Sequence, residues 1–280
     1  MSSAVVSTSA AQGRPFVFDA ENVAEGRPPQ RAVLGAFIPG AFKDARLAGV
    51  TAASRLAVRP APEMVSSGIA AMDALTGGLP RGCLTEICGP ASSGRTTLLL
   101  AALAAATRRG ECCVVVDASD ALDPQSATAA GVELDRLLWV RCGESSPQKC
   151  LEQLLRAADL LLESGGFGLI ALDLGDLPPQ TARHIPLTTW FRFRRAVEHT
   201  PTVLLSIERQ SIAGSCSSLL IKLGQGQRIK ESTNSQFSAL THAKLLTELE
   251  ITAELVRSRL ERKPVRSAEI TFASKTAWAG

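Results

Sequence analysis

The stretch Gly89–Thr96, GPASSGRT, places a cation and a hydroxyl behind a pair of glycines. Two glycines with four residues between them, followed by a basic residue and a threonine, allow backbone N–H groups to converge on phosphate oxygens. A turn that only caps the next helix is the simpler interpretation. The spacing favours a nucleotide phosphate site, whose expected contacts are Gly89, Pro90, Ala91, Ser92, Ser93, Gly94, Arg95, Thr96 and Thr97.

Arg95 stands where loops of this kind carry lysine. A lysine ammonium is a compact point charge, whereas the guanidinium is longer, planar and forked. Arginine therefore keeps the charge but cannot take the lysine position unless the loop or the phosphates move. We expect phosphate binding to survive and efficient phosphoryl transfer to be weakened.

A carboxylate follows a second apolar run, because LIALD ends in Asp173 after four apolar residues. At the end of a parallel strand such a group organises Mg²⁺ and its water, and the hydroxyl of Thr96 is the other expected metal ligand. The alternative is an aspartate that caps the turn before Leu177.

Short apolar runs alternate with helical segments from Val65 onward, which is typical of an α/β domain with a mostly parallel sheet flanked by helices. The expected strands are Leu84–Cys88, Cys112–Ala118, Leu137–Cys142, Phe167–Asp173, Thr202–Glu208 and Ser217–Leu223. The expected helices are Thr96–Arg109, Pro124–Ala130, Ser146–Glu163 and Leu187–Glu198.

The two ends of the chain differ from this pattern. Residues 1–60 are rich in Ala, Ser, Gly, Pro and Arg, and we expect a flexible arm there, with residues 61–280 forming the core domain. In LLTELEITAELVRSR apolar and acidic residues alternate, which predicts a half-buried strand. The turn ERKP would pair it with RSAEITFA, so an antiparallel hairpin should end the domain.

The composition sets limits on location and partners. The 280 residues are 45% hydrophobic with a net charge of +3, so any contact with nucleic acid must come from a local patch. The seven cysteines lack metal-ligand spacing, and we expect buried reduced thiols. No leader and no apolar run of about 18 residues is apparent, so we expect a cytoplasmic protein that does not contact membranes.

The segment GGLPRGCLTEICGPASSGRTTLLL, followed by VVVDASDALDPQSATAAGVELDRLLWV, resembles the bacterial branch of the RecA/RAD51 recombinase superfamily. The resemblance covers about Ser67–Asp173. It implies a RecA-type P-loop ATPase core with ATP and Mg²⁺ as cofactors.

The functional positions implied by this resemblance are unevenly kept. The lysine falls at Arg95, and the metal ligands fall at Thr96 and Asp173. The glutamate that activates the attacking water falls at Ser119, which cannot act as a base. Asp123 matches the adenine contact. No catalytic residue is therefore assigned, and slow or absent hydrolysis is expected.

Other parts depart further from a recombinase. The aromatic residue that stacks on the base falls at Ser126, and short or helical segments replace the two glycine-rich DNA loops. With the altered phosphate loop, these departures resemble the ImuA-type RecA-like accessory proteins of bacterial translesion mutagenesis. That resemblance implies a polymerase-like partner of the ImuB type.

Basic residues gather in two places. In Thr188–His199 the residues Trp190, Phe193 and Val197 form one helical stripe, which favours core packing. Stacking of DNA bases on the aromatic residues is the alternative, with phosphates bound by Arg192, Arg194 and Arg195. The hairpin carries a second cluster, either a solvated edge or a phosphate-binding edge, made of Arg257, Arg259, Arg262, Lys263 and Arg266.

The sequence therefore favours a RecA-like accessory protein of DNA repair and the SOS response that supports translesion synthesis through protein contacts. RecA and single-stranded DNA are further candidate partners. Three alternatives stay open: an active DNA-dependent ATPase and recombinase, an interaction module that binds no nucleotide, and a kinase or clock-like ATPase of the same fold.

Overall fold

The computed structural model describes residues 61–143, 146–225, 227–228, 248–260 and 268–275. The chain divides into two units, Met1–Arg59 and Pro60–Gly280, and only the second contains described residues. The expected arm, and the expected exposed loop after residue 228, therefore lie outside the described residues. No helix in the described ranges is long and apolar enough to cross a membrane.

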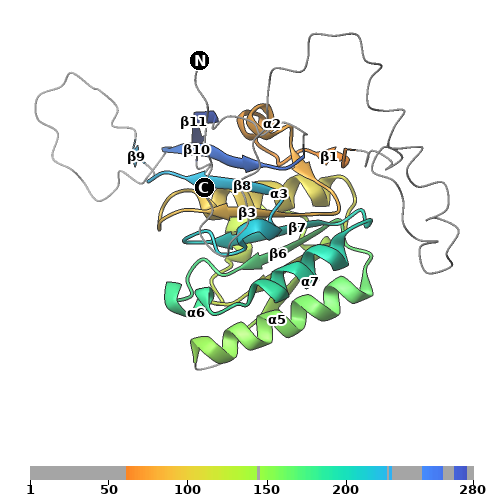
Figure 1. Ribbon diagram of the computed structural model, residues 1–280. Helices are drawn as coiled ribbons and strands as arrows, with labels where there is room; N and C mark the ends of the chain where they lie inside the picture. Colours follow the sequence, from red (N-terminus) through yellow and green to blue (C-terminus); the bar gives the residue numbers. More distant parts are fainter. Residues whose placement is uncertain (1–60, 144–145, 226, 229–247, 261–267, 276–280) are drawn as a thin grey trace, which may run out of the picture. The chain divides into compact units, whose positions relative to one another are not determined.

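The described residues contain a nine-stranded sheet in which β3 lies near the centre (Figure 1). The order is β11-β10-β8-β3-β7-β6-β4-β5, and β9 (Gln227–Arg228) pairs with β10. Strands from β8 to β5 run parallel, which confirms the expected α/β class. Their bounds are Cys83–Cys88 for β3, Cys113–Asp117 for β4, Leu137–Arg141 for β5, Leu169–Asp173 for β6, Val203–Glu208 for β7 and Leu219–Leu223 for β8.

Helices cover both faces of the sheet, and α5 and α7 lie side by side on one of them (Figure 1). Along β4, Val115 joins the core on the α3 side, while Val114 and Val116 join the core on the α5 and α7 side. A strand buried on both faces needs this unbroken apolar run. The helices are α2 (Ala70–Thr76), α3 (Arg95–Arg108), α4 (Pro124–Ala129), α5 (Pro147–Ser164), α6 (Pro179–Arg183) and α7 (Leu187–Val197).

The ends of the elements follow their capping residues. Ser146 caps α5 by accepting a hydrogen bond from the Lys149 N–H at 3.3 Å, so the helix begins one residue after its predicted start.

Two features of the described residues differ from the sequence-based expectations. Cys112 is exposed and lies just before β4, which begins at Cys113, so the expectation of buried thiols is wrong there. The pattern gave no indication of α2 or of the small sheet formed by β1 (Met64–Val65) and β2 (Leu79–Pro80).

The C-terminal hairpin is confirmed. The antiparallel pair is β10 (Glu248–Ser258) and β11 (Ala268–Lys275), and β10 joins the sheet by pairing antiparallel with β8. Ile251, Ala253 and Leu255 are buried at 0%, 0% and 4% exposure, as the alternation with acidic residues predicts. The hairpin thereby extends the core over the α3 side of the sheet.

The strand order decides which residues meet at the carboxyl edge. Neighbouring strands β3, β7, β6 and β4 end at Cys88, Glu208, Asp173 and Asp117 respectively, and their register sets Cys88 opposite Glu208 and Asp173 opposite Asp117. Ligands of open α/β sheets bind beyond the carboxyl ends of the strands. The candidate site is therefore expected along this row.

Candidate nucleotide site

The phosphate loop connects β3 to α3 in the conformation that anion binding requires. Ser92 and Gly94 have positive φ angles of 59° and 93°, so successive N–H groups can turn toward one centre. The first N–H groups of α3 have no partner within the helix and add the positive end of its dipole. A Cβ on Gly94 would lie 2.4 Å from the Ile251 Cδ1, so β10 packing also demands glycine there.

Side chains of the loop divide into an exposed and a buried set. Pro90, Ala91, Ser92 and Thr96 are exposed, which leaves the Thr96 hydroxyl open to a ligand. Ser93 is fully buried, and its Oγ has no hydrogen-bond partner within the described part of the chain. The backbone angles and exposed side chains of the loop are thus compatible with the phosphates of a nucleotide.

Arg95 does not lie free above this loop. Its Nη1 donates to the Gly175 carbonyl at 2.9 Å, and its Nη2 lies 3.8 Å from the Asp176 Oδ1. Arg209, next to the end of β7, donates from Nε to the same carbonyl at 2.9 Å, with Nη2 at 3.7 Å from the same carboxylate. The guanidiniums of Arg95 and Arg209 therefore both contact the loop between β6 and α6.

The sequence analysis did not predict this cluster. A parallel sheet in which β7 lies between β3 and β6 was needed to bring the three segments together. Burial lowers the pKa of the Arg95 guanidinium, against the opposing effect of Asp173 and Asp176. Even so, an arginine stays protonated in a protein.

Asp173 ends β6, and Gly175 N–H donates to its Oδ1 at 2.9 Å. Burial, together with the nearby carboxylates of Asp117 and Asp176, raises the pKa of Asp173 to about 6. A Cβ on Gly175 would lie 2.7 Å from Arg95 Nη1 and 3.0 Å from Asp173 Oδ1. Arg95 Nη1 and Asp173 Oδ1 therefore both lie close to Gly175.

The β4 end holds the position expected for a catalytic glutamate. Ser119 is exposed and its N–H donates to the Asp117 Oδ1 at 3.0 Å. The neighbouring Asp120 accepts two 2.6 Å hydrogen bonds from Arg141, whose guanidinium lies 4.7 Å from the centre of the Trp139 ring. Asp120 is thus held by Arg141 of β5 and does not replace the missing base.

Asp123 serves as the N-cap of α4. Its carboxylate accepts hydrogen bonds from the Gln125 N–H at 3.2 Å, the Ser126 N–H at 3.0 Å and the Ser126 Oγ at 2.5 Å. Those hydrogen bonds lower the pKa of Asp123, the Ser126 hydroxyl first. The side chain is exposed, and whether it contacts a base stays a prediction.

Comparisons with known proteins agree with this geometry. Residues 49–182 match the profile of the RecA N-terminal domain. The RadB recombinase crystal structure superposes with a TM-score of 0.51 at 17% identity, over 74% of this chain and 94% of that one. The fold is RecA-like. The matched part of this chain is similar in sequence to the RecA N-terminal domain.

Sequence relatives are RecA proteins. Protein RecA of Acinetobacter baumannii is 44% identical over 115 residues, which is 40% of this chain and 31% of that protein. Protein RecA of Corynebacterium jeikeium is 45% identical over 117 residues, 41% of this chain and 30% of that protein. The chain thus spans about a third of the length of the RecA relatives that it matches.

In this RecA-like domain, α7 lies beyond the matched profile. Trp190, Phe193 and Val197 are 0% exposed, and the two rings pack edge to face with centroids 6.1 Å apart, so the core interpretation is confirmed. Arg192 forms two hydrogen bonds with Asp159 of α5, at 2.9 and 2.8 Å. DNA binding by Arg192, partly buried Arg194 and exposed Arg195 stays a prediction.

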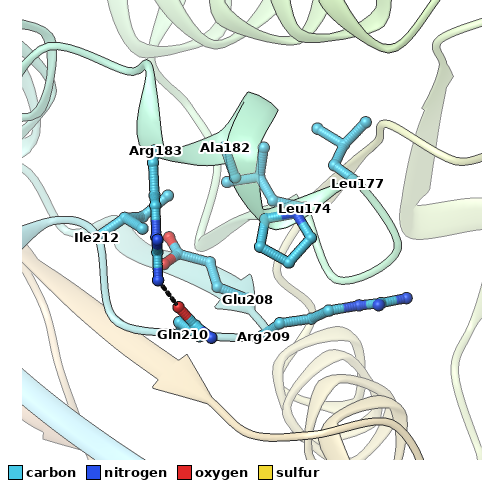
Figure 2. Close-up of a pocket in the computed structure, with 9 residues that line it drawn as sticks. Leu174, Leu177, Ala182, Arg183, Glu208, Arg209, Gln210 and Ile212 are labelled. Atoms are coloured by element: carbon cyan, nitrogen blue, oxygen red, sulfur yellow. Dashed lines mark hydrogen bonds between the residues drawn. The ribbon is translucent and has the colours of Figure 1, made fainter.

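A small cleft lies beyond the ends of β6 and β7 in the RecA-like fold (Figure 2). Leu174, Leu177 and Ile212 give it apolar walls. Arg183 of α6 donates a hydrogen bond to Gln210 and so links α6 to the segment that follows β7 (Figure 2). Glu208 is 1% exposed, and burial raises its pKa well above the usual range.

The carboxylate of Glu86 organises the segment after β7. Its Oε1 accepts hydrogen bonds from the Ile212 and Ala213 N–H groups at 2.6 and 3.0 Å, and its Oε2 accepts one from Ser217 Oγ at 3.1 Å. Arg257 also donates to Ser217 Oγ, at 2.6 Å. A solvated edge, one reading of the hairpin cluster, is therefore wrong for Arg257, and Arg262, Lys263 and Arg266 lie outside the described residues.

Proposed function

We propose that this protein is a RecA-like accessory factor of the bacterial DNA-damage response that holds nucleotide phosphates but hydrolyses ATP slowly or not at all. One observation carries the proposal: the phosphate loop keeps its binding conformation, whereas the water-activating position is Ser119. A serine cannot take a proton from water as a carboxylate does, and loss of a general base costs roughly 10²–10⁴ in rate.

In this proposal the backbone of the loop and the start of α3 bind the phosphates of the nucleotide. Thr96 and Asp123 are the proposed side-chain contacts on the two sides of the nucleotide. ATP supplies the phosphoanhydride bond when it is bound. Asp117 and Asp120 hold the β4 end in place through hydrogen bonds to Ser119 N–H and Arg141, so neither is free to orient a water.

We further propose the finer role of an ImuA-type factor in translesion synthesis. A polymerase-like partner of the ImuB type, RecA and single-stranded DNA are the proposed partners. The helix α7 supports a role through protein contacts, because Phe191 and Leu187 are 50% and 51% exposed on its outer side. Large apolar side chains flanked by arginines are frequent at protein interfaces.

The hydrolysis test is steady-state phosphate release with ATP, Mg²⁺ and single-stranded DNA. Wild-type protein should show turnover near the detection limit, and Ser119→Glu should raise it at least tenfold by restoring a base. Ala121→Glu is the matched control, because it adds the same charge at another exposed position two residues away. Strong DNA-stimulated turnover by wild-type protein would return it to the active recombinases.

Assembly is tested separately by size-exclusion chromatography with light scattering. A ligand shifts an assembly equilibrium only by its differential affinity for the two states. Nucleotide and DNA should leave the mass distribution unchanged, while a cognate polymerase-like partner should co-elute without nucleotide. Long nucleotide-dependent filaments would contradict the accessory role.

A further inference from the structure

Two basic clusters that are far apart in the sequence meet at one short 3₁₀ helix, η5 (Gly214–Cys216). This helix packs against α7, and Cys216 Sγ donates a hydrogen bond to the Leu187 carbonyl at 3.8 Å. From just after β10, Arg259 donates from Nη1 to the Ser215 carbonyl at 2.8 Å. The helix α7 and the end of the C-terminal strand β10 are therefore both anchored to η5.

Arg194 brings the positive charge of α7 to the same place. Residues two apart on a helix do not share a face, and Arg192 is held by Asp159 of α5, so Arg194 lies on the side of α7 that does not face α5. Burial raises the pKa of the Cys216 thiol, and the guanidiniums of Arg194 and Arg259 oppose that rise. Both guanidiniums are therefore near η5.

Apolar side chains are exposed beside these charges. Leu187 and Phe191 are 51% and 50% exposed, and with Arg195 they form one row along α7, because residues four apart share a face. Arg195 is exposed and belongs to no ion pair in the described ranges. Rows of this kind pack into the grooves of another helix. The row therefore offers apolar anchors and an unpaired positive charge to a partner.

We call these side chains the η5 surface, which consists of Leu187, Phe191, Arg194, Arg195 and Arg259. We propose that the η5 surface binds an acidic amphipathic helix of a partner protein. The apolar stripe of that helix packs on the α7 row, and its carboxylates meet the guanidiniums. The inference deepens the proposed accessory role and rests on it for the source of the helix, which is the polymerase-like partner.

A single strand of nucleic acid fits the η5 surface less well. Proteins that bind single strands combine a continuous positive groove with several aromatic side chains that stack on successive bases. Phe191 is the single aromatic residue of the η5 surface, and the aliphatic Leu187 offers no ring for stacking. On the other side of α7, Asp159 neutralises Arg192 and interrupts the positive charge. The observations therefore favour a short acidic segment over a long polyanion.

The first experiment measures the binding of a fluorescent peptide to the full chain by fluorescence anisotropy. The probe is an acidic helix with leucines at positions i, i+4 and i+7 and glutamates between them. Phe191→Ala, Arg195→Glu and Arg259→Glu should each raise its Kd at least tenfold. Leu160→Ala and Arg156→Glu are the matched controls, because they make the same kinds of change at exposed positions of α5, and they should alter the Kd less than twofold.

Thermal unfolding checks that each variant is folded, and a scrambled peptide of the same composition checks that the helical stripe matters. Wild-type binding no tighter for the acidic helix than for the scrambled peptide would overturn the proposal. Binding that is unaffected by Phe191→Ala and Arg195→Glu would overturn it as well. A labelled single-stranded oligonucleotide is titrated in parallel. Tighter binding of the oligonucleotide, lost in Arg195→Glu, would assign the η5 surface to nucleic acid and contradict the proposal.

A second experiment separates this inference from the proposed function. The cognate polymerase-like partner is combined with wild-type protein and with Phe191→Ala in size-exclusion chromatography. Co-elution with wild-type protein that is lost in Phe191→Ala would support both proposals. Co-elution with both proteins would overturn the η5 surface and leave the accessory role in place. Peptide binding that depends on Phe191, without any co-elution, would support the η5 surface and refute the polymerase-like partner.

Discussion

Asp117 and Asp173 lie opposite each other at the ends of β4 and β6, yet their surroundings differ. Asp117 accepts hydrogen bonds from Ser119 N–H, Leu122 N–H and the Trp139 indole at 3.0, 2.8 and 3.3 Å. For Asp173 only the Gly175 N–H donor is found among the described residues. A carboxylate saturated by its own chain maintains structure, and one left short of donors is available for a ligand or a cation.

The largest effect is expected from Asp117→Ala. Removing the carboxylate leaves two backbone N–H groups and an indole without their acceptor, which should lower the free energy of unfolding by about 3 kcal/mol. Urea unfolding followed by circular dichroism measures this. A loss below about 1 kcal/mol would mean that water replaces the carboxylate and that the two aspartates are equivalent.

Asp173→Asn should act in the opposite direction. The pKa of Asp173 rises from 3.8 to about 6 on folding, so its ionised form costs stability at neutral pH. The amide keeps the acceptor for Gly175 N–H and removes the charge, which should stabilise the protein by about 2 kcal/mol at pH 7. Urea unfolding of both proteins across pH measures this difference.

The pH dependence of this difference follows from the sign of the shift. The folded state binds the proton more tightly, so the cost of ionised Asp173 is fully present above pH 6 and disappears as pH falls toward 4. Wild-type and variant stabilities should therefore converge on acidification. A constant difference between pH 4 and pH 7 would show that the pKa of Asp173 is not raised.

Gly175→Ala should give a smaller change, under about 1 kcal/mol, because the atom in its way is the end of a flexible side chain. The new methyl should shift Arg95 Nη1 away from the Gly175 carbonyl, and urea unfolding should show only this small loss of stability. Gly143→Ala is the control, since no atom of the described residues lies within 4 Å of its Cβ position.

The smallest effect is expected from Asp120→Ala. Its pair with Arg141 is exposed on the surface, where ion pairs contribute little and are screened by salt. Thermal unfolding should give the same Tm as wild-type protein in physiological salt. A clear drop in Tm would mean that this pair, and not only Asp117, fixes the β4 end.

Much of the core could be predicted because its signals are local. The unbroken apolar run of β4 and the alternation in β10 decide which strands are buried on two faces and which on one. The capping serine of α5 gives its start to within one residue. Burial of Trp190 also followed from helical spacing alone.

The candidate site could be predicted only in part. Glycine spacing located the phosphate loop. Arg95 in that loop, and Ser119 at the position where the RecA resemblance implies a glutamate, indicated that ATP hydrolysis would be slow. The contacts of Arg95 could not be predicted from the sequence pattern, because Gly175 is 80 residues away along the chain. The same holds for Glu86, whose partners lie more than 120 residues later.

The sequence by itself determined the elements and the loop, since periodicity, capping and positive-φ glycines act over a few residues. Tertiary structure alone decided the pairing of charges. Inserting β7 between β3 and β6 brings Arg209, Arg95 and Asp173 to one loop. Electrostatic energies depend on distance and burial and not on sequence separation, so only the strand order could determine that Arg95 and Arg209 meet at the loop that follows Asp173.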